Sequence, residues 1–266
     1  MNRIAIAKET IQITVTGEYQ YNSETVFLPE ADFDSVVVIT PELAQELLDD
    51  PLPDPEQNVP CKIEVTTEDT FSAAQRLGEA LVLNFANAHH PGGGFLLGAT
   101  AQEEALCRCS TLYASINSTS AAEMYRYNNL HIRATDSDYM LLSRDVSVFR
   151  DPNCELLPEP FSAAVITAPA PNRRGAAVLT GKKTLEQTFL RRAAIILRAA
   201  VRYGYRNLVL GAWGCGAFGN DPGMVAKCFQ QALAADSLTL YFDTVCFAIY
   251  GSEGSKNYQA FKSVFK

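Results

Sequence analysis

Two adjacent acids, Glu103 and Glu104, follow a glycine run in an arrangement suited to proton transfer. The run is Gly92–Gly94, and seven residues separate it from Gln102, which precedes the acids. Consecutive glycines let the backbone approach a ligand closely and adopt positive φ angles. Two neighbouring carboxyl groups can then supply a general acid and a clamp for ligand hydroxyls. The structural alternative is a flexible connection, followed by acids that are favoured at a helix N-terminus by the macrodipole.

A second glycine-rich segment, Gly214–Gly219, predicts a phosphate site. It follows the apolar run Leu208–Ala212 and precedes Asp221-Pro222. A strand that leads through glycines to a helix N-terminus exposes backbone N–H groups to an anion, although a plain turn is the alternative. Phe218 can lie against a sugar or base. The G-x-G-x-x-G match suggests a dinucleotide-binding unit, but only 47 residues follow Gly219 and the expected acid at the end of the next strand is missing.

Other chemically active side chains give weaker signals. His89 and His90 lie beside the first glycine run without a third ligand at a metal-binding spacing, so we expect no metal. Cys215 has no evident base and is interpreted as a small loop residue. The seven cysteines contain no CxxC pair, and a chain of this length does not need a disulfide framework. Reduced thiols and an intracellular location follow as expectations.

Apolar runs that alternate with helical patterns must position both glycine segments. Several runs lack polar alternation, as expected for strands buried on both faces. Helices are predicted over Glu104–Ile116, from a capping box at Thr184–Gln187 to Gly204, and after the N-cap Asp221. This order predicts a three-layer α/β/α domain. The predicted strands are 35–40, 62–66, 80–85, 139–149, 163–168, 208–212 and 244–250.

Composition and charge limit the class of protein. A net charge of −8 argues against general nucleic-acid binding. Between Arg173 and Arg206, nine Lys/Arg face one acid, Glu186, which predicts a surface for an anionic partner or the solvated face of a helix. Breaker residues over 49–60 predict a loop, with 1–60 as an extension packed on the domain 61–266. No apolar run approaches the ~18 residues that span a bilayer, and no signal peptide is predicted.

Both glycine segments together resemble a known family. GGG, seven residues and QEE match the GGG-x(6–8)-QEE signature of poly(ADP-ribose) glycohydrolases, and GAWGCGAFGND is similar to the diphosphate-binding loop of that family. The chain resembles the bacterial-type branch over nearly its whole length. The resemblance implies an α/β macrodomain with a mixed central sheet, Glu104 as catalytic acid and Glu103 holding ribose hydroxyls. Other implied ADP-ribose contacts are Asn87, Gly92, Gly93, Gly94, Gln102, Gly214, Cys215, Gly216, Ala217, Phe218, Gly219 and, at the adenine, Tyr250.

The implied activity is hydrolysis of ribose–ribose O-glycosidic bonds, which releases ADP-ribose. Two alternatives stay open: removal of single ADP-ribose groups from a protein or nucleic-acid acceptor, and a non-catalytic ADP-ribose reader. The intact acid pair counts against a reader. The expected partners are ADP-ribose, its polymer or ADP-ribosylated proteins, with nucleic acid only as an ADP-ribosylated acceptor and no membrane. We expect a cytoplasmic monomer without metal or cofactor, with the nucleus as the other open compartment.

One question of acidity stays open at this level. A helix N-terminus lowers the pKa of a carboxyl group, whereas a general acid benefits from a raised pKa. Burial beside a second carboxylate and an anionic ligand raises the pKa of the carboxyl group.

Overall fold

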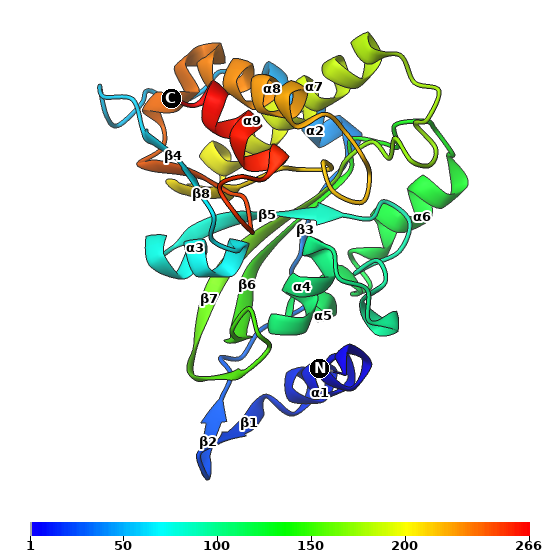
Figure 1. The fold of residues 1–266 in the computed structure, drawn as a ribbon, viewed down its shortest axis with the longest axis vertical. Helices are drawn as coiled ribbons and strands as arrows, with labels where there is room; N and C mark the ends of the chain where they lie inside the picture. The colour runs from blue at the N-terminus through cyan, green and yellow to red at the C-terminus, as the bar shows by residue number, and fades with distance from the viewer. Residues whose placement is uncertain (1) are drawn as a thin grey trace.

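Seven strands form the central sheet of the protein: β3 (Val37–Ile39), β4 (Lys62–Thr66), β5 (Ala80–Ala86), β6 (Met140–Arg150), β7 (Leu156–Pro169), β8 (Asn207–Leu210) and β9 (Thr244–Ala248). The computed structural model describes residues 2–266 and gives the strand order β3-β6-β7-β5-β8-β9-β4 (Figure 1). β3 pairs antiparallel with β6, and β6 with β7. The neighbour pairs from β7 to β4 are parallel. The sheet is therefore mixed, as the resemblance implied.

Helices cover both faces of this sheet, which confirms the three layers (Figure 1). Strand β5 shows why two cores form: Leu81 and Leu83 point into one, and Ala80 and Val82 into the other. Side chains alternate along a strand, so an uninterrupted apolar run supplies both faces. One layer holds α2 (Pro41–Asp49), α7 (Lys182–Arg202), α8 (Pro222–Ala234) and α9 (Lys256–Val264); the other holds α3 (Thr70–Leu77), α4 (Gln102–Cys109), α5 (Leu112–Ile116) and α6 (Ala122–Leu130). The short 3₁₀ turns are η1 (Phe95–Leu97) and η2 (Ala235–Leu240).

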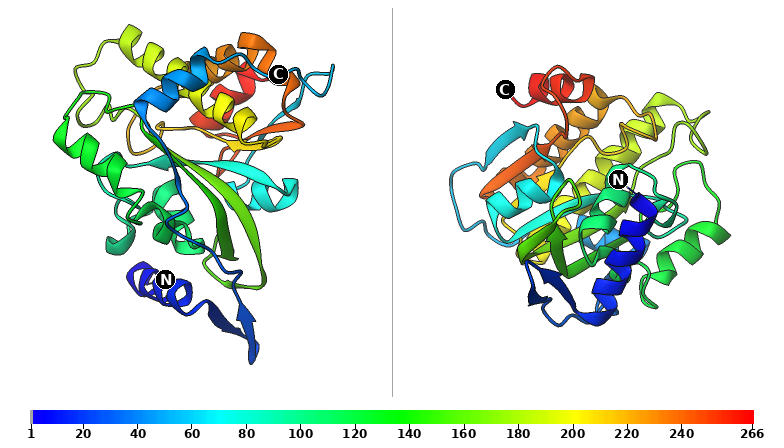
Figure 2. Two further views of the ribbon diagram at one scale, coloured as in Figure 1. Left: turned by 180° about the vertical axis from the view of Figure 1, so that it is seen from behind. Right: turned by 60° about the horizontal axis from the view of Figure 1, so that its bottom comes forward.

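The N-terminal segment is distributed over the whole molecule. Helix α1 (Arg3–Thr16) lies at one end, beneath α4 and α5, and is followed by the hairpin of β1 (Glu18–Tyr21) and β2 (Glu24–Phe27) (Figure 2). Thr10 Oγ1 donates to Arg108 O at 2.8 Å, which ties α1 to α4. The chain then adds β3 to the sheet edge and packs α2 on α7. The division at residue 60 remains a prediction about folding units.

Two helix boundaries differ from the sequence predictions. The helix predicted over Glu104–Ile116 is interrupted, because Ser110 bridges to Val148 and the Thr111 N–H donates to Ser147 O at 3.0 Å. The prediction that a capping box at Thr184–Gln187 starts the next helix is wrong, because α7 begins at Lys182 after the N-cap Gly181. The N-cap of α8 is confirmed: Asp221 Oδ1 accepts from Met224 N at 2.8 Å.

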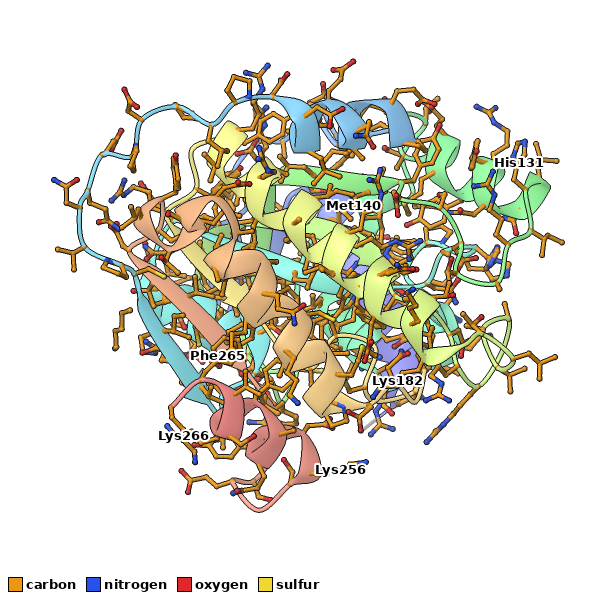
Figure 3. All side chains as sticks on the ribbon, turned by 90° about the horizontal axis from the view of Figure 1, so that it is seen from above. His131, Met140, Lys182, Lys256, Phe265 and Lys266 are labelled. Carbon is orange, nitrogen blue, oxygen red and sulfur yellow. The ribbon has the colours of Figure 1, made fainter. Side chains whose placement is uncertain are left out.

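The basic segment is only partly a free surface. Figure 3 shows α7 beside α8, with Lys182 at the start of α7. Arg192 of α7 is buried and pairs with Asp138 at 2.9 Å, and Arg191 pairs with the same carboxylate at 2.7 Å. Arg198 donates to Leu47 O and Asp50 O.

Within residues 2–266, no helix combines the length and apolar character needed to cross a membrane.

Candidate active site

The second glycine segment and the acid pair meet at one cavity of about 290 Å³. It lies at the carboxyl ends of β5, β8 and β9, where ligands bind in open α/β sheets. In Figure 1 the arrowhead of β5 lies between α4 and the loop that leads into α8. The cavity is bordered by nine of the residues predicted from the sequence: Asn87, Gln102, Glu103, Glu104, Gly214, Gly216, Ala217, Phe218 and Tyr250.

Glu104 presents one unpaired carboxyl oxygen at this cavity. Its Oε1 accepts from the Gly94 N–H at 2.9 Å. Its Oε2 is buried and has no hydrogen-bond partner in the protein. A buried polar oxygen without a partner costs about 1–3 kcal/mol, so such an atom in a cleft indicates a partner that arrives with the ligand. Glu104 can therefore exchange a proton with a bound molecule.

Glu103 is held by two asparagines, and both of its oxygens are engaged. Oε2 accepts from the Asn87 N–H at 2.8 Å, and Oε1 accepts from Asn84 Nδ2 at 3.3 Å. Burial raises the pKa of Glu103 to about 8, and the nearby Glu104 charge adds to this, whereas the bonds from Asn87 and Asn84 oppose it. Desolvation therefore outweighs the helix N-terminus at Glu103 and favours the protonated form of this carboxyl group.

The glycine run packs against the two carboxyl groups and does not itself border the cavity. Gly92 and Gly93 have φ angles of +69° and +55°. A Cβ at Gly93 would lie 2.6 Å from Glu104 Oε1 and 3.1 Å from Glu103 Oε2. A glycine is required here for two reasons, the left-handed backbone and the space that both carboxyl groups occupy.

Gln102 borders the cavity and also anchors α4 to the end of β5. Its Oε1 accepts from the Phe85 N–H at 2.9 Å, and its Nε2 donates to Leu83 O at 2.8 Å and to Thr70 Oγ1 at 3.1 Å. These bonds occupy the amide and fasten the first turn of α4 to the end of β5. Gln102 thus fixes the position of the two glutamates that follow it.

The second glycine segment forms a closed loop over the cavity. Asn220 Nδ2 donates to Gly214 O at 2.9 Å and to Pro171 O at 2.8 Å, which fixes both ends of the loop. Gly216 and Ala217 are exposed, and a Cβ at Gly216 would meet no atom within 4 Å. Exposed backbone at a helix N-terminus is a suitable cradle for an anion. Gly219 lies against the Arg174 side chain.

Of the remaining candidates, one borders the cavity and the others make contacts within the protein. Tyr250 borders the cavity with 77% of its surface exposed, so its ring is free to stack on a ligand. Cys215 donates to Trp213 O at 3.5 Å, and burial raises the pKa of its thiol, which does not favour a nucleophile. His89 pairs with Asp136 at 3.0 Å. Among residues 2–266, no group of three or more His, Cys, Asp or Glu side chains is arranged to hold a metal ion.

Sequence reasoning missed several residues that border the cavity. They share a position at or just after a strand end, or at the start of a helix, which is the only signal that could have identified them. They are Thr70, Phe85, Ala101, Ala212, Ala248, Ile249 and Asn257.

A mixed sheet between two helical layers, with an acid pair and a glycine loop at its strand ends, defines a macrodomain with the groups of a glycosidase. The profile described as microbial-type PARG, catalytic domain, matches residues 7–151. The chain belongs to this family of poly(ADP-ribose) glycohydrolases.

Solved structures of bacterial relatives agree with this assignment over nearly the whole chain. The poly(ADP-ribose) glycohydrolase of Thermomonospora curvata is 40% identical over 99% of both chains, with a TM-score of 0.91. A structure of the T. curvata enzyme bound to the inhibitor ADP-HPD is 38% identical over 98% of both chains, with a TM-score of 0.86. The Deinococcus radiodurans enzyme in complex with ADP-ribose is 36% identical over 86% of this chain and 93% of that chain, with a TM-score of 0.79. A comparison with curated protein sequences gave no match.

Proposed function

We propose that this protein is a poly(ADP-ribose) glycohydrolase that cleaves ribose–ribose O-glycosidic bonds with Glu104 as general acid and base. The observation that carries the role of Glu104 is its buried Oε2, which has no hydrogen-bond partner in the protein although the residue borders the cavity. Glu103, by contrast, already uses both oxygens to accept hydrogen bonds. The family and the relatives support the activity itself.

In the proposed complex, ADP-ribose lies in the cavity in one orientation. The diphosphate lies against the exposed backbone of Gly216 and Ala217, in the loop that leads to the N-terminus of α8. Phe218 lies against the ribose that is cleaved, and Asn87 and Glu103 hold its hydroxyls. A protonated Glu103 can donate a hydrogen bond to a ribose hydroxyl, which an ionised carboxylate cannot. The adenine then extends toward Tyr250.

Cleavage follows from this placement in two proton transfers. Glu104 protonates the leaving ribose oxygen while positive charge develops at the anomeric carbon. The ligand diphosphate stabilises that charge electrostatically. The ionised Glu104 then takes a proton from the attacking water, and the acid is restored for the next turnover.

The decisive experiment compares Glu104→Gln with its neighbour Glu103→Gln. The glutamine at 104 keeps an oxygen for the Gly94 N–H but has no transferable proton, so turnover of poly(ADP-ribose) should fall by a factor on the order of 10²–10⁴. Glu103→Gln should lose less, because an amide can still orient ribose hydroxyls. ADP-ribose affinity, measured by calorimetry, should change little in Glu104→Gln.

The same assay separates the other two functions. Release of ADP-ribose from a mono-ADP-ribosylated protein, without release from the polymer, would indicate a mono-ADP-ribosyl hydrolase. Tight ADP-ribose binding without hydrolysis of either substrate would indicate a reader. Full activity of Glu104→Gln would refute the assigned mechanism, provided that circular dichroism shows a native fold.

We also propose that the protein acts as an intracellular monomer on ADP-ribosylated proteins. Its seven cysteines are all free thiols, which supports a reducing compartment. Size-exclusion chromatography with light scattering tests the monomer, and fractionation of the source cells tests the compartment.

A further inference from the structure

Two cysteines outside the cavity lie together where α4 meets the turn between β6 and β7. Cys109 is the last residue of α4, and Cys154 closes the turn that begins at Asp151. The Cys109 thiol donates to Asp151 O at 3.3 Å, and the Cys154 N–H donates to the same oxygen at 2.8 Å. Neighbouring backbone is paired across this junction, where Ser110 bridges to Val148. The two residues are therefore held side by side by the fold.

Two buried arginines surround this pair with positive charge. Arg150 is 4% exposed; its Nη1 donates to Cys154 O at 2.8 Å, and its Nε is buried without a hydrogen-bond partner. Arg108, equally buried, donates to Ala99 O at 2.6 Å. The acid Glu9 faces Arg150 from the exposed side, at 2.7 Å. The Arg150 Nε therefore keeps an unused hydrogen-bond donor next to the turn that holds Cys154.

Cys154 is the more accessible of the two thiols. It is half-buried and reachable by a small molecule, whereas Cys109 is buried. The neighbouring Cys109 thiol, followed by the charges of Arg108 and Arg150, holds the pKa of the Cys154 thiol below its ordinary value against the opposing effect of burial. The neighbouring Cys154 thiol, together with burial, raises the pKa of the Cys109 thiol. Thiolates at exposed, positively charged positions react with oxidants most readily.

We propose that Cys154 is a hydrogen peroxide-reactive thiol and that Cys109 resolves its oxidised form as an intramolecular disulfide. The Cys154 thiolate attacks one peroxide oxygen, the O–O bond breaks, and the departing hydroxide takes a proton to leave as water. The sulfenic acid at Cys154 is then attacked by the Cys109 sulfur, after loss of its proton, so that the S–S bond forms and the S–O bond breaks with release of a second water. Two thiols are oxidised by two electrons and one peroxide is reduced.

Oxidation at this position has a direct connection to the proposed active site, and this part of the inference rests on the proposed function. Cys109 ends the eight-residue helix that begins with Gln102, Glu103 and Glu104. Arg108 links the helix to Ala99 in the loop between the glycine run and the acids. A disulfide would draw the end of α4 toward the turn, which would move the carboxyl groups at its start.

The chemical test uses the full-length protein with Cys61→Ser as the matched control. Cys61 is also half-buried, but burial raises the pKa of its thiol to about 11. In the wild type at pH 7, iodoacetamide should alkylate Cys154 at least about tenfold faster than Cys61, because the thiolate is the reactive form. Limited hydrogen peroxide should give a mass lower by two hydrogens and a linked peptide pair containing Cys109 and Cys154.

The variants separate the two proposed tasks. Cys154→Ser should give no linked pair, Cys109→Ser should stop at a sulfenic acid that dimedone traps, and Cys61→Ser should behave as the wild type. Alkylation of Cys61 as fast as Cys154, or a linked pair that survives in Cys154→Ser, would overturn the assignment.

Turnover provides a separate measurement. The linked form should hydrolyse poly(ADP-ribose) at least about threefold more slowly and recover with dithiothreitol. Undiminished turnover of the fully linked protein would refute the connection to the active site, while the mass measurement decides the thiol chemistry independently of any activity.

Discussion

Gly93→Ala provides a test of how closely the glycine run and the acid pair are fitted. The alanine Cβ would lie 2.6 Å from Glu104 Oε1, whereas real Cβ contacts essentially never fall below 3.0 Å. The carboxyl oxygen must therefore move by at least the difference, 0.4 Å, and its bond from the Gly94 N–H must stretch or break. Since a misplacement near 1 Å can cost about 10²-fold in rate, we expect turnover to fall by roughly 10- to 100-fold.

The backbone adds a separate cost that the control must remove. An alanine at the Gly93 φ of +55° loses about 1–2 kcal/mol of stability relative to glycine. Gly17→Ala carries the same kind of strain at φ +72°, but its Cβ would meet no atom within 4 Å. Both variants should therefore lose stability in urea titrations, because both adopt the left-handed backbone.

The assay is steady-state release of ADP-ribose from poly(ADP-ribose), with ADP-ribose affinity measured alongside. Gly93→Ala should lose turnover far more than affinity, because the diphosphate loop is untouched. Gly17→Ala should keep its turnover. Equal turnover in the two variants would show that the contact between Gly93 and the carboxyl groups does not position the acid.

Three further results are expected. The pKa of Glu103 is raised to about 8 in the folded protein from 4.5, so the contribution of Glu103 to the free energy of unfolding is fully present below pH 4.5 and is lost as the pH rises toward 8. This loss is at most about 1.4 kcal/mol per pH unit, and Glu103→Gln should remove it. Urea titrations at pH 5 and pH 8 measure the free energy of unfolding of the wild type and of Glu103→Gln. An equal change between the two pH values in both proteins would contradict the raised pKa. Gly216→Val should weaken ADP-ribose binding at least tenfold, about 1.4 kcal/mol, in calorimetry while the fold survives, since its Cβ meets no protein atom; unchanged affinity would place the diphosphate elsewhere. Arg198→Ala should lower stability by about 1–3 kcal/mol, and most of the loss should persist at high salt, because Arg198 bonds to two carbonyl oxygens besides its exposed ion pair with Asp236; a loss confined to low salt would indicate a screened surface charge.

The sequence by itself determined the parts of the protein that depend on local pattern. The strand patterns predicted β4 with its observed bounds and β5 to within one residue. The β5 run is apolar without alternation, because a strand buried on both faces needs apolar side chains on both. The N-cap Asp221 also follows from its immediate neighbours. The spacing between the glycine run and the acids located the cavity, since glycines are required where the backbone passes close to other groups.

Only the tertiary structure decided which groups at that cavity are free to react. Neither the unpaired oxygen of Glu104 nor the raised pKa of Glu103 can be read from two adjacent glutamates. The amide of Gln102 is occupied by β5, which is distant in sequence. Likewise Cys109 and Cys154 meet only because β6 and β7 return the chain to α4. Burial and hydrogen-bond partners come from residues far apart in the chain, so acidity and free bonding capacity are properties of the folded molecule.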